Sequence, residues 1–192
     1  MKSPYLIGER IYFRALERED AALCRDFVND PDVWRTLDQH RPKNLSFEEE
    51  WIAGQCRNEH TITFGITLKQ NDRLIGVTAL DRIDAVHRKA GFGLTIGAKD
   101  EWHKGYGTEA TQLMLKYGFM TLNLNRIVLN VYSTNPFALR AYKKAGFILE
   151  GTLRQDMFRE GKYIDVFRMG ILREEWERLT QKSFECTGLT DA

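Results

Sequence analysis

The stretch that decides how this chain is interpreted is Trp-His-Lys-Gly-Tyr-Gly-Thr-Glu-Ala, residues 102–110, which leads directly into an amphipathic helical pattern. Gly105 and Gly107 stand at the start of that helix, where the first backbone N–H groups have no intrahelical partner. Glycine has no side chain to shield those groups, and the helix dipole adds positive potential there. The stretch therefore predicts a turn that binds a phosphate or pyrophosphate through the backbone.

The sequence that follows this turn is basic. Between Thr111 and Leu149 there is no Asp or Glu, and the local charge is +5 in a chain whose net charge is +1. The cations of this span are Lys116, Arg126, Arg140, Lys143 and Lys144. A carboxylate-free basic stretch after an anion-binding turn favours a ligand with several phosphate charges.

Two common phosphate ligands fit this turn poorly. A nucleoside-triphosphate loop needs a Lys directly after its last glycine, whereas Gly107 is followed by Thr108 and Glu109. The turn also matches the dinucleotide pattern G-x-G-x-x-A, but that mode needs an acidic residue about 20 positions downstream to hold the ribose. The acid-free span excludes such a residue, which leaves coenzyme A as the third candidate.

A second motif supports coenzyme A. The stretch Asn-Pro-Phe-Ala-Leu-Arg-Ala-Tyr-Lys-Lys-Ala-Gly-Phe, residues 135–147, is similar to N-x-x-[AS]-x-x-x-Y-x-x-x-G-F of the GNAT superfamily of acyl-CoA N-acyltransferases. The chain resembles this superfamily across roughly residues 8–172. Its turn matches the family loop [QR]-x-x-G-x-[GA] except at Trp102, a departure that resembles the branch of ribosomal-protein N-terminal acetyltransferases. Residues 150–169 also resemble spermidine N-acetyltransferases.

The resemblance implies a fold and a donor. The expected fold is α/β, with a mixed, mostly antiparallel sheet of six or seven strands, helices on both faces, and a splay between the fourth and fifth strands. Acetyl-CoA is the expected acetyl donor, and its pantetheine arm is expected to lie in that splay as an added strand. The expected CoA-binding residues are Leu94, Thr95, Ile96, Trp102, His103, Lys104, Gly105, Tyr106, Gly107, Thr108, Asn130, Asn135, Ala138, Tyr142 and Lys144.

Acetyl transfer also needs groups that move protons. Tyr142 matches the family's tyrosine that protonates the departing thiolate. Many family members carry a carboxylate near the start of the fourth strand, but this chain reads Lys-Ala-Gly-Phe at residues 89–92. Asp81 is the first substitute as general base, followed by Asp84 and His87. The missing carboxylate leaves open a second hypothesis, a non-catalytic acyl-CoA-binding regulatory module.

The acceptor is predicted to be a primary amine, either a small amine such as a polyamine or a protein N-terminus. Between Glu17 and Glu59 there are eleven acidic and six basic residues, a local charge of −5. In the family this region forms the acceptor-side wall, and an acidic wall attracts a cationic amine. Trp34 is a candidate for lining the same pocket.

Composition limits the remaining possibilities. A length of 192 residues with 43% hydrophobic content fits one domain, expected at 1–180 with a tail at 181–192. The near-zero net charge argues against a nucleic-acid partner, and no apolar run is long enough to span a membrane. The three cysteines show no metal-binding spacing, so no metal is expected. We expect a cytoplasmic protein that is a candidate for homodimer formation.

Local patterns predict several element boundaries. Ser46 and Glu49 form the pattern of a capping box that opens a helix. The residues 70–72 between two β-rich runs predict a hairpin. Asn135 is predicted to cap a helix that begins at Pro136 and stops at Gly146. A short polar helix is expected from Leu172.

Overall fold

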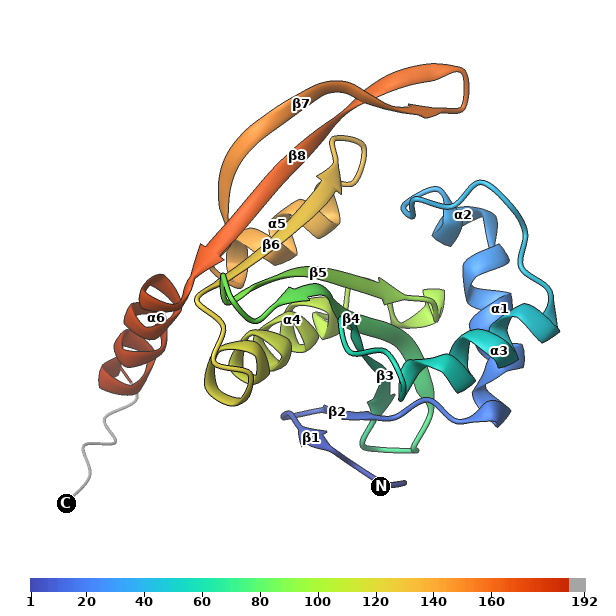
Figure 1. Cartoon of the computed structure of the whole chain (residues 1–192), viewed down its shortest axis with the longest axis horizontal. Helices are drawn as coiled ribbons and strands as arrows, with labels where there is room; N and C mark the ends of the chain where they lie inside the picture. The colour runs from blue at the N-terminus through green and yellow to red at the C-terminus, as the bar shows by residue number, and fades with distance from the viewer. Residues whose placement is uncertain (187–192) are drawn as a thin grey trace.

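The computed structural model describes residues 1–186, with side chains described through residue 181. Eight strands form one sheet in the order β1-β2-β3-β4-β5-β6-β8-β7 (Figure 1). The strands are β1 (Leu6–Ile7), β2 (Ile11–Arg14), β3 (Ile62–Leu68), β4 (Leu74–Asp84), β5 (Lys89–Ile96), β6 (Arg126–Tyr132), β7 (Ile148–Arg159) and β8 (Lys162–Leu172). Every pairing is antiparallel except that of β5 with β6.

The helices interrupt the strand order at three places. They are α1 (Ala21–Asn29), α2 (Pro31–Trp34), α3 (Leu45–Gln55), α4 (Tyr106–Lys116), α5 (Pro136–Lys144) and α6 (Arg173–Cys186). Short 3-10 turns precede α1 and α4, and a π-helical turn follows α4. Within residues 1–186, no helix combines the length and the apolar character that a bilayer crossing requires.

The sheet opens between β5 and β6. Their parallel ladder contains only three pairs, from Lys89–Arg126 to Gly91–Val128. Beyond Gly91, β5 stays paired with β4 alone, and β6 stays paired with β8. The strands therefore diverge and leave the inner edges of both without a strand partner, as the family resemblance implies.

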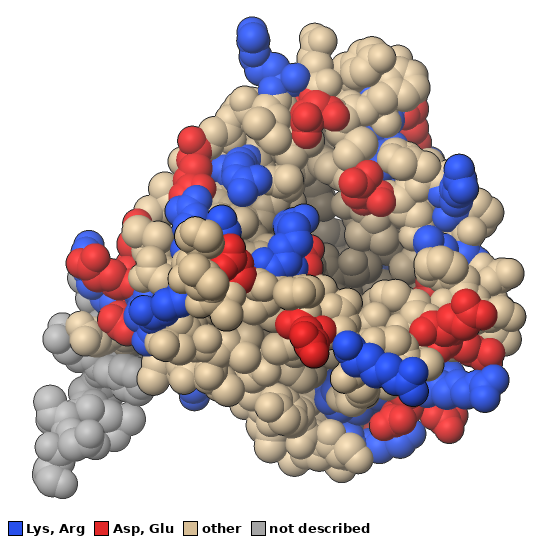
Figure 2. All heavy atoms as spheres, in the orientation of Figure 1, with Lys and Arg blue, Asp and Glu red and all other residues tan. Residues whose placement is uncertain are grey.

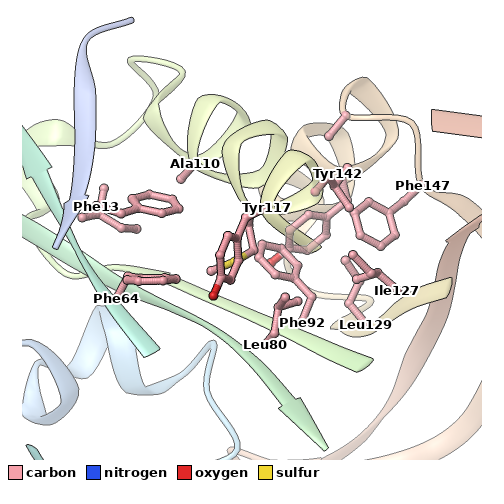
Figure 3. Close-up of a cluster of buried hydrophobic side chains, with 14 of the residues drawn as sticks. Phe13, Phe64, Leu80, Phe92, Ala110, Tyr117, Ile127, Leu129, Tyr142 and Phe147 are labelled. Carbon is pink, nitrogen blue, oxygen red and sulfur yellow. The ribbon is translucent and has the colours of Figure 1, made fainter. Parts of the chain in front are cut away.

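Helices cover both faces of the sheet. On one face, α4 and α5 pack on a core of buried side chains that includes Leu80, Phe92 and Leu129 (Figure 3). On the other face, α1 and α3 form a smaller cluster around Cys24 and Ile52. Successive residues of a strand point to opposite faces, so β4 places Leu80 in the first core and turns Asp81 to the second face.

The fold class agrees with the sequence prediction, but three details differ. The sheet has eight strands instead of six or seven, because the two-residue β1 is too short to leave a periodic pattern. The prediction of a capping box at Ser46 is wrong, because α3 begins at Leu45. Asn44 caps the helix by accepting a 2.9 Å hydrogen bond from the Phe47 N–H. The final helix α6 continues past residue 181, and residues 187–192 lie outside the described part.

Other local predictions are confirmed. Asp72 has a positive φ in the turn between β3 and β4, where the hairpin was expected. The Asn135 side chain accepts a 3.0 Å hydrogen bond from the Ala138 N–H and so caps α5. Gly146 takes a φ of +104° just after that helix, a conformation that favours glycine.

Candidate active site

The turn before α4 has the geometry of an anion-binding site. Gly105 is the N-cap of α4, has a φ of +87°, and supplies no side chain to cap the helix. His103 also has a positive φ, of 62°. With no side-chain cap, the first N–H groups of α4 are available to an anionic ligand.

The turn is fastened to the sheet from two sides. On one side, the Arg10 guanidinium donates to the Lys104 carbonyl at 2.9 Å and forms an ion pair with Glu109 at 2.9 Å. On the other side, the Trp102 indole N–H donates to the Ile96 carbonyl at 2.7 Å. Trp102, at the first position of the loop, therefore joins the end of β5 to the turn.

A groove of about 650 Å³ runs from this turn along β5 to α5. It is lined by all of the predicted CoA residues except Lys104 and Asn130. The Lys104 ammonium instead pairs with the Glu101 carboxylate at 2.9 Å, and Asn130 lines the neighbouring cavity. The groove thus gathers residues of β5, the turn and α5, which are far apart in sequence.

Phe137 and Arg140 are among the groove residues that were not predicted as site candidates. Phe137 lies with its ring centroid 4.3 Å from that of His103, and the Arg140 guanidinium lies 4.6 Å from the Phe137 ring. Both line the groove. Arg140 belongs to the basic stretch noted in the sequence. The contact between Phe137 and His103 joins residues that are far apart in the chain, so no local sequence pattern predicts it.

Tyr142 lies where the groove meets a second cavity, and it lines both. Its ring packs edge-to-face with Phe92 at 6.0 Å and contacts Phe147 at 5.9 Å between centroids (Figure 3). Burial raises the pKa of Tyr142 to about 12. The phenol therefore stays protonated at neutral pH, which suits a proton donor and excludes a general base.

The second cavity has a volume of about 730 Å³ and lies on the face covered by α1 and α3. Figure 2 shows the hollow at the centre of this view. Four of its described lining residues are acidic: Asp38, Glu48, Asp81 and Asp156. Two are basic, namely Lys43 and Arg82.

Asp81 lines this cavity at the point where the sheet opens. It pairs across the β4–β5 ladder with Gly91, the last β5 residue that pairs with β6. A Cβ atom at Gly91 would lie 1.8 Å from the Asp81 Oδ1, so the carboxylate occupies the space that a side chain there would fill. The Arg82 guanidinium lies 3.0 Å from the same oxygen.

The other predicted base candidates lie elsewhere. The Asp84 carboxylate pairs with the His87 ring at 2.8 Å, and this pair does not line the cavity. Trp34 does not line it either, because it lies beside a smaller cavity where the Arg159 guanidinium is 5.3 Å from its ring. Of the acidic residues between Glu17 and Glu59, only Asp38 and Glu48 line this second cavity.

The β7–β8 hairpin closes the far side of the cavity. Arg159, near the hairpin tip, donates to the Leu37 carbonyl at 2.6 Å and to the Gln39 carbonyl at 3.2 Å. Arg35 and Glu160 form an ion pair at 2.7 Å across the same gap. Figure 1 shows the hairpin reaching toward α2. The cavity is therefore bounded by segments more than a hundred residues apart in the chain.

The protein-family model of the acetyltransferase (GNAT) domain matches residues 10–148 of this chain. The chain belongs to the GNAT family of acetyltransferases.

Its relatives agree with the branch that the sequence predicts. The chain is similar to a spermidine N(1)-acetyltransferase of Escherichia coli, with 37% identity over 86% of this chain and 88% of the relative. A putative ribosomal N-acetyltransferase of Bacillus subtilis is 28% identical over 89% of this chain and 96% of that protein. The crystal structure of Vibrio cholerae spermidine N-acetyltransferase with CoA and spermine superposes with a TM-score of 0.82, at 30% identity, over 88% of this chain and 98% of that one.

These findings make the protein an acetyl-CoA-dependent N-acetyltransferase of the GNAT family. They give no support to the alternative of a non-catalytic regulatory module. The roles of individual side chains in this GNAT protein remain predictions, and each can be tested.

The first such prediction concerns Trp102. Trp102→Phe keeps an aromatic ring but removes the 2.7 Å hydrogen bond to the Ile96 carbonyl. We expect about 1 kcal/mol lower unfolding free energy, the usual contribution of one hydrogen bond. We also expect several-fold weaker CoA binding, because the turn loses its attachment to β5. Denaturant unfolding and calorimetry with CoA measure the two effects, and unchanged CoA affinity would contradict the proposed function of the contact.

Proposed function

We propose that this enzyme transfers the acetyl group of acetyl-CoA to the primary amine of a cationic small molecule of the polyamine class, by direct attack in a ternary complex. One observation carries the proposal. The groove and the second cavity, which we call the acceptor cavity, share Thr36, Leu94, Thr95, Asn135, Ala138 and Tyr142, so a donor in one and an acceptor in the other meet at these residues. The similarity to spermidine acetyltransferases supports the choice of acceptor class.

The chemistry requires that the amine lose a proton before it attacks. An alkylammonium has a pKa of about 10, so only about one molecule in a thousand is neutral at pH 7. In the proposed mechanism, Asp81 accepts that proton directly or through water, since it is the cavity carboxylate closest in the ladder to the opening of the sheet. The amine nitrogen then forms a bond to the thioester carbon.

The remaining steps concern the oxyanion and the leaving group. A backbone N–H on the unpartnered edge of β5 is suited to stabilise the carbonyl oxygen as negative charge develops. When the C–S bond breaks, the thiolate of CoA takes a proton from the Tyr142 hydroxyl, which burial keeps protonated. The nitrogen that attacked then loses its second proton, which returns through water to the Tyr142 oxygen, and Asp81 releases its proton to solvent. The products are the acetylated amine, free CoA and one proton.

Release of free thiol from acetyl-CoA tests this proposal. The acceptor panel contains spermidine, spermine, 1,4-diaminobutane, a neutral-tailed amino alcohol and peptides with free N-termini. We expect the polyamines to give the highest kcat/KM. Turnover with the peptides alone would reject the polyamine class, and no turnover with any acceptor would reject the transferase chemistry proposed for this site.

A variant of Asp81 tests the proposed base. Asp81→Asn should lower kcat/KM at pH 7 by at least about tenfold. This loss is smaller than the factor of about 10² to 10⁴ usual for general acid–base catalysis, because water can partly replace the carboxylate. The midpoint of the acidic limb of the pH–rate profile should also shift, since the proton acceptor has changed. Asp84→Asn is the matched control, because Asp84 pairs with His87 outside the cavity. A profile for Asp81→Asn that equals the parent's would remove Asp81 from the mechanism.

A further inference from the structure

The carboxylate of Glu48 is buried on the wall of the acceptor cavity. Glu48 lies in the first turn of α3 and retains only 4% of its accessible surface, yet it lines the cavity together with Cys24, Phe47 and Trp51. The cluster that α1 and α3 form beside it consists of apolar side chains and one thiol. Charged carboxylates are rarely buried in such surroundings without a partner.

No such partner is found. Among residues with described side chains, none donates a hydrogen bond to the Glu48 carboxylate or forms an ion pair with it. Its neighbour Glu49, in contrast, forms a surface ion pair with Arg18 at 3.2 Å. Burial raises the pKa of Glu48, and attraction from Lys43 only partly opposes that effect. The charged form of Glu48 is thus disfavoured in the folded protein, and Lys43 compensates for only part of that cost.

Glu48 lies toward the opposite end of the cavity from the reacting groups. Trp51, three residues along the same face of α3, packs with Val77 against the α1–α3 cluster. Val77 precedes Asp81 by four residues on β4, which corresponds to about 13 Å along a strand. A distance of this order separates the terminal nitrogens of an extended triamine such as spermidine, whereas 1,4-diaminobutane is too short to span it.

We propose that Glu48 binds the second, non-reacting ammonium group of the acceptor amine and so selects acceptors that carry two or more positive charges. This inference rests on the proposed function. The α1–α3 cluster beside Glu48 is apolar, and a cation that enters the cavity supplies the opposite charge that this cluster does not provide. Glu48 is then a specificity residue, whereas Asp81 and Tyr142 serve the amine that reacts.

The substitution Glu48→Gln tests the inference, because it removes the charge and keeps the shape. We expect the KM for spermidine to rise at least tenfold with kcat within about twofold of the parent's. The KM for 4-amino-1-butanol, in which a hydroxyl replaces the second amine, should stay unchanged. Glu50→Gln is the matched control, since Glu50 is an exposed residue of the same helix and loses the same charge.

Two further measurements do not depend on turnover. Calorimetry of spermidine binding to the protein saturated with CoA, which has no acetyl group to transfer, should show at least tenfold weaker binding for Glu48→Gln and no change for Glu50→Gln. The melting temperature of Glu48→Gln at pH 7 should equal or exceed that of the parent, because a buried unpaired charge is removed.

The outcomes separate the inference from the proposed function. Equal losses of kcat with spermidine and with 4-amino-1-butanol would overturn the inference, because Glu48 would then act on the reacting amine. Unchanged spermidine affinity in Glu48→Gln would overturn it as well. A parent that binds spermidine through Glu48 but acetylates no amine would leave the inference standing and reject the proposed function.

Discussion

The substitution Tyr142→Phe should lower kcat by at least about a hundredfold and leave CoA affinity unchanged, since loss of a proton donor usually costs a factor of about 10² to 10⁴. The phenyl ring preserves the contacts with Phe92 and Phe147, so the core that positions α5 stays intact. Only the hydroxyl is lost, and with it the proton for the departing thiolate.

The pH dependence sharpens this prediction. Burial raises the pKa of Tyr142 to about 12, above its ordinary value of 10.0. Because the folded-state pKa is the higher one, the protonated phenol and the stability linked to it persist below pH 10 and are lost as the pH rises toward 12. The parent should therefore show no loss of activity from Tyr142 ionisation below about pH 10.

Steady-state rates and calorimetry with CoA distinguish the possible outcomes. Retained CoA binding with lost turnover supports the role of proton donor. A Tyr142→Phe protein as active as the parent would show that water protonates the thiolate. Tyr106→Phe is the control, because Tyr106 also lines the groove but does not line the acceptor cavity.

The second large effect is expected at the turn, where Gly107→Val should raise the dissociation constant for CoA at least tenfold, or about 1.4 kcal/mol. Gly107 is the second residue of α4, and a Cβ atom there would meet only the Leu94 side chain, at an ordinary contact distance of 3.6 Å. The protein itself can accommodate the side chain, so the cost falls on the ligand phosphates that approach the helix N-terminus.

Gly54→Val is the control for this substitution. Gly54 is also a helical glycine, in α3, and a Cβ atom there would have no neighbour within 4 Å. The control substitution changes the helix propensity by a similar amount, but the variant should bind CoA with the same affinity as the parent. Gly105 is a poorer test, because its φ of +87° makes any side chain strained before a ligand is considered. Unchanged affinity in a folded Gly107→Val protein would contradict the pyrophosphate assignment.

Local sequence was sufficient to predict the glycine turn before α4 and the cap of α5, both of which line the groove. The turn at Gly105 and the cap at Asn135 depend on contacts within a few residues, so a short sequence pattern with fixed spacing is enough to predict both. The same reasoning erred at Ser46, because Asn44 offers a competing cap two residues earlier and the choice between them depends on how α3 packs. It also missed β1, whose two residues become a strand only by pairing with β2.

The acceptor side was decided by tertiary structure. Asp81 acquires its place because β4 pairs with β5 in a register that sets it over Gly91, and no local pattern specifies that register. Glu48 differs from its neighbours Glu49 and Glu50 only in facing the cavity, which depends on the packing of α3 against the sheet. Helix caps and glycine turns arise from short-range hydrogen bonds that the sequence determines directly. Charge burial and strand divergence arise from contacts between distant segments, so only the assembled fold determines which acidic residues line the second cavity.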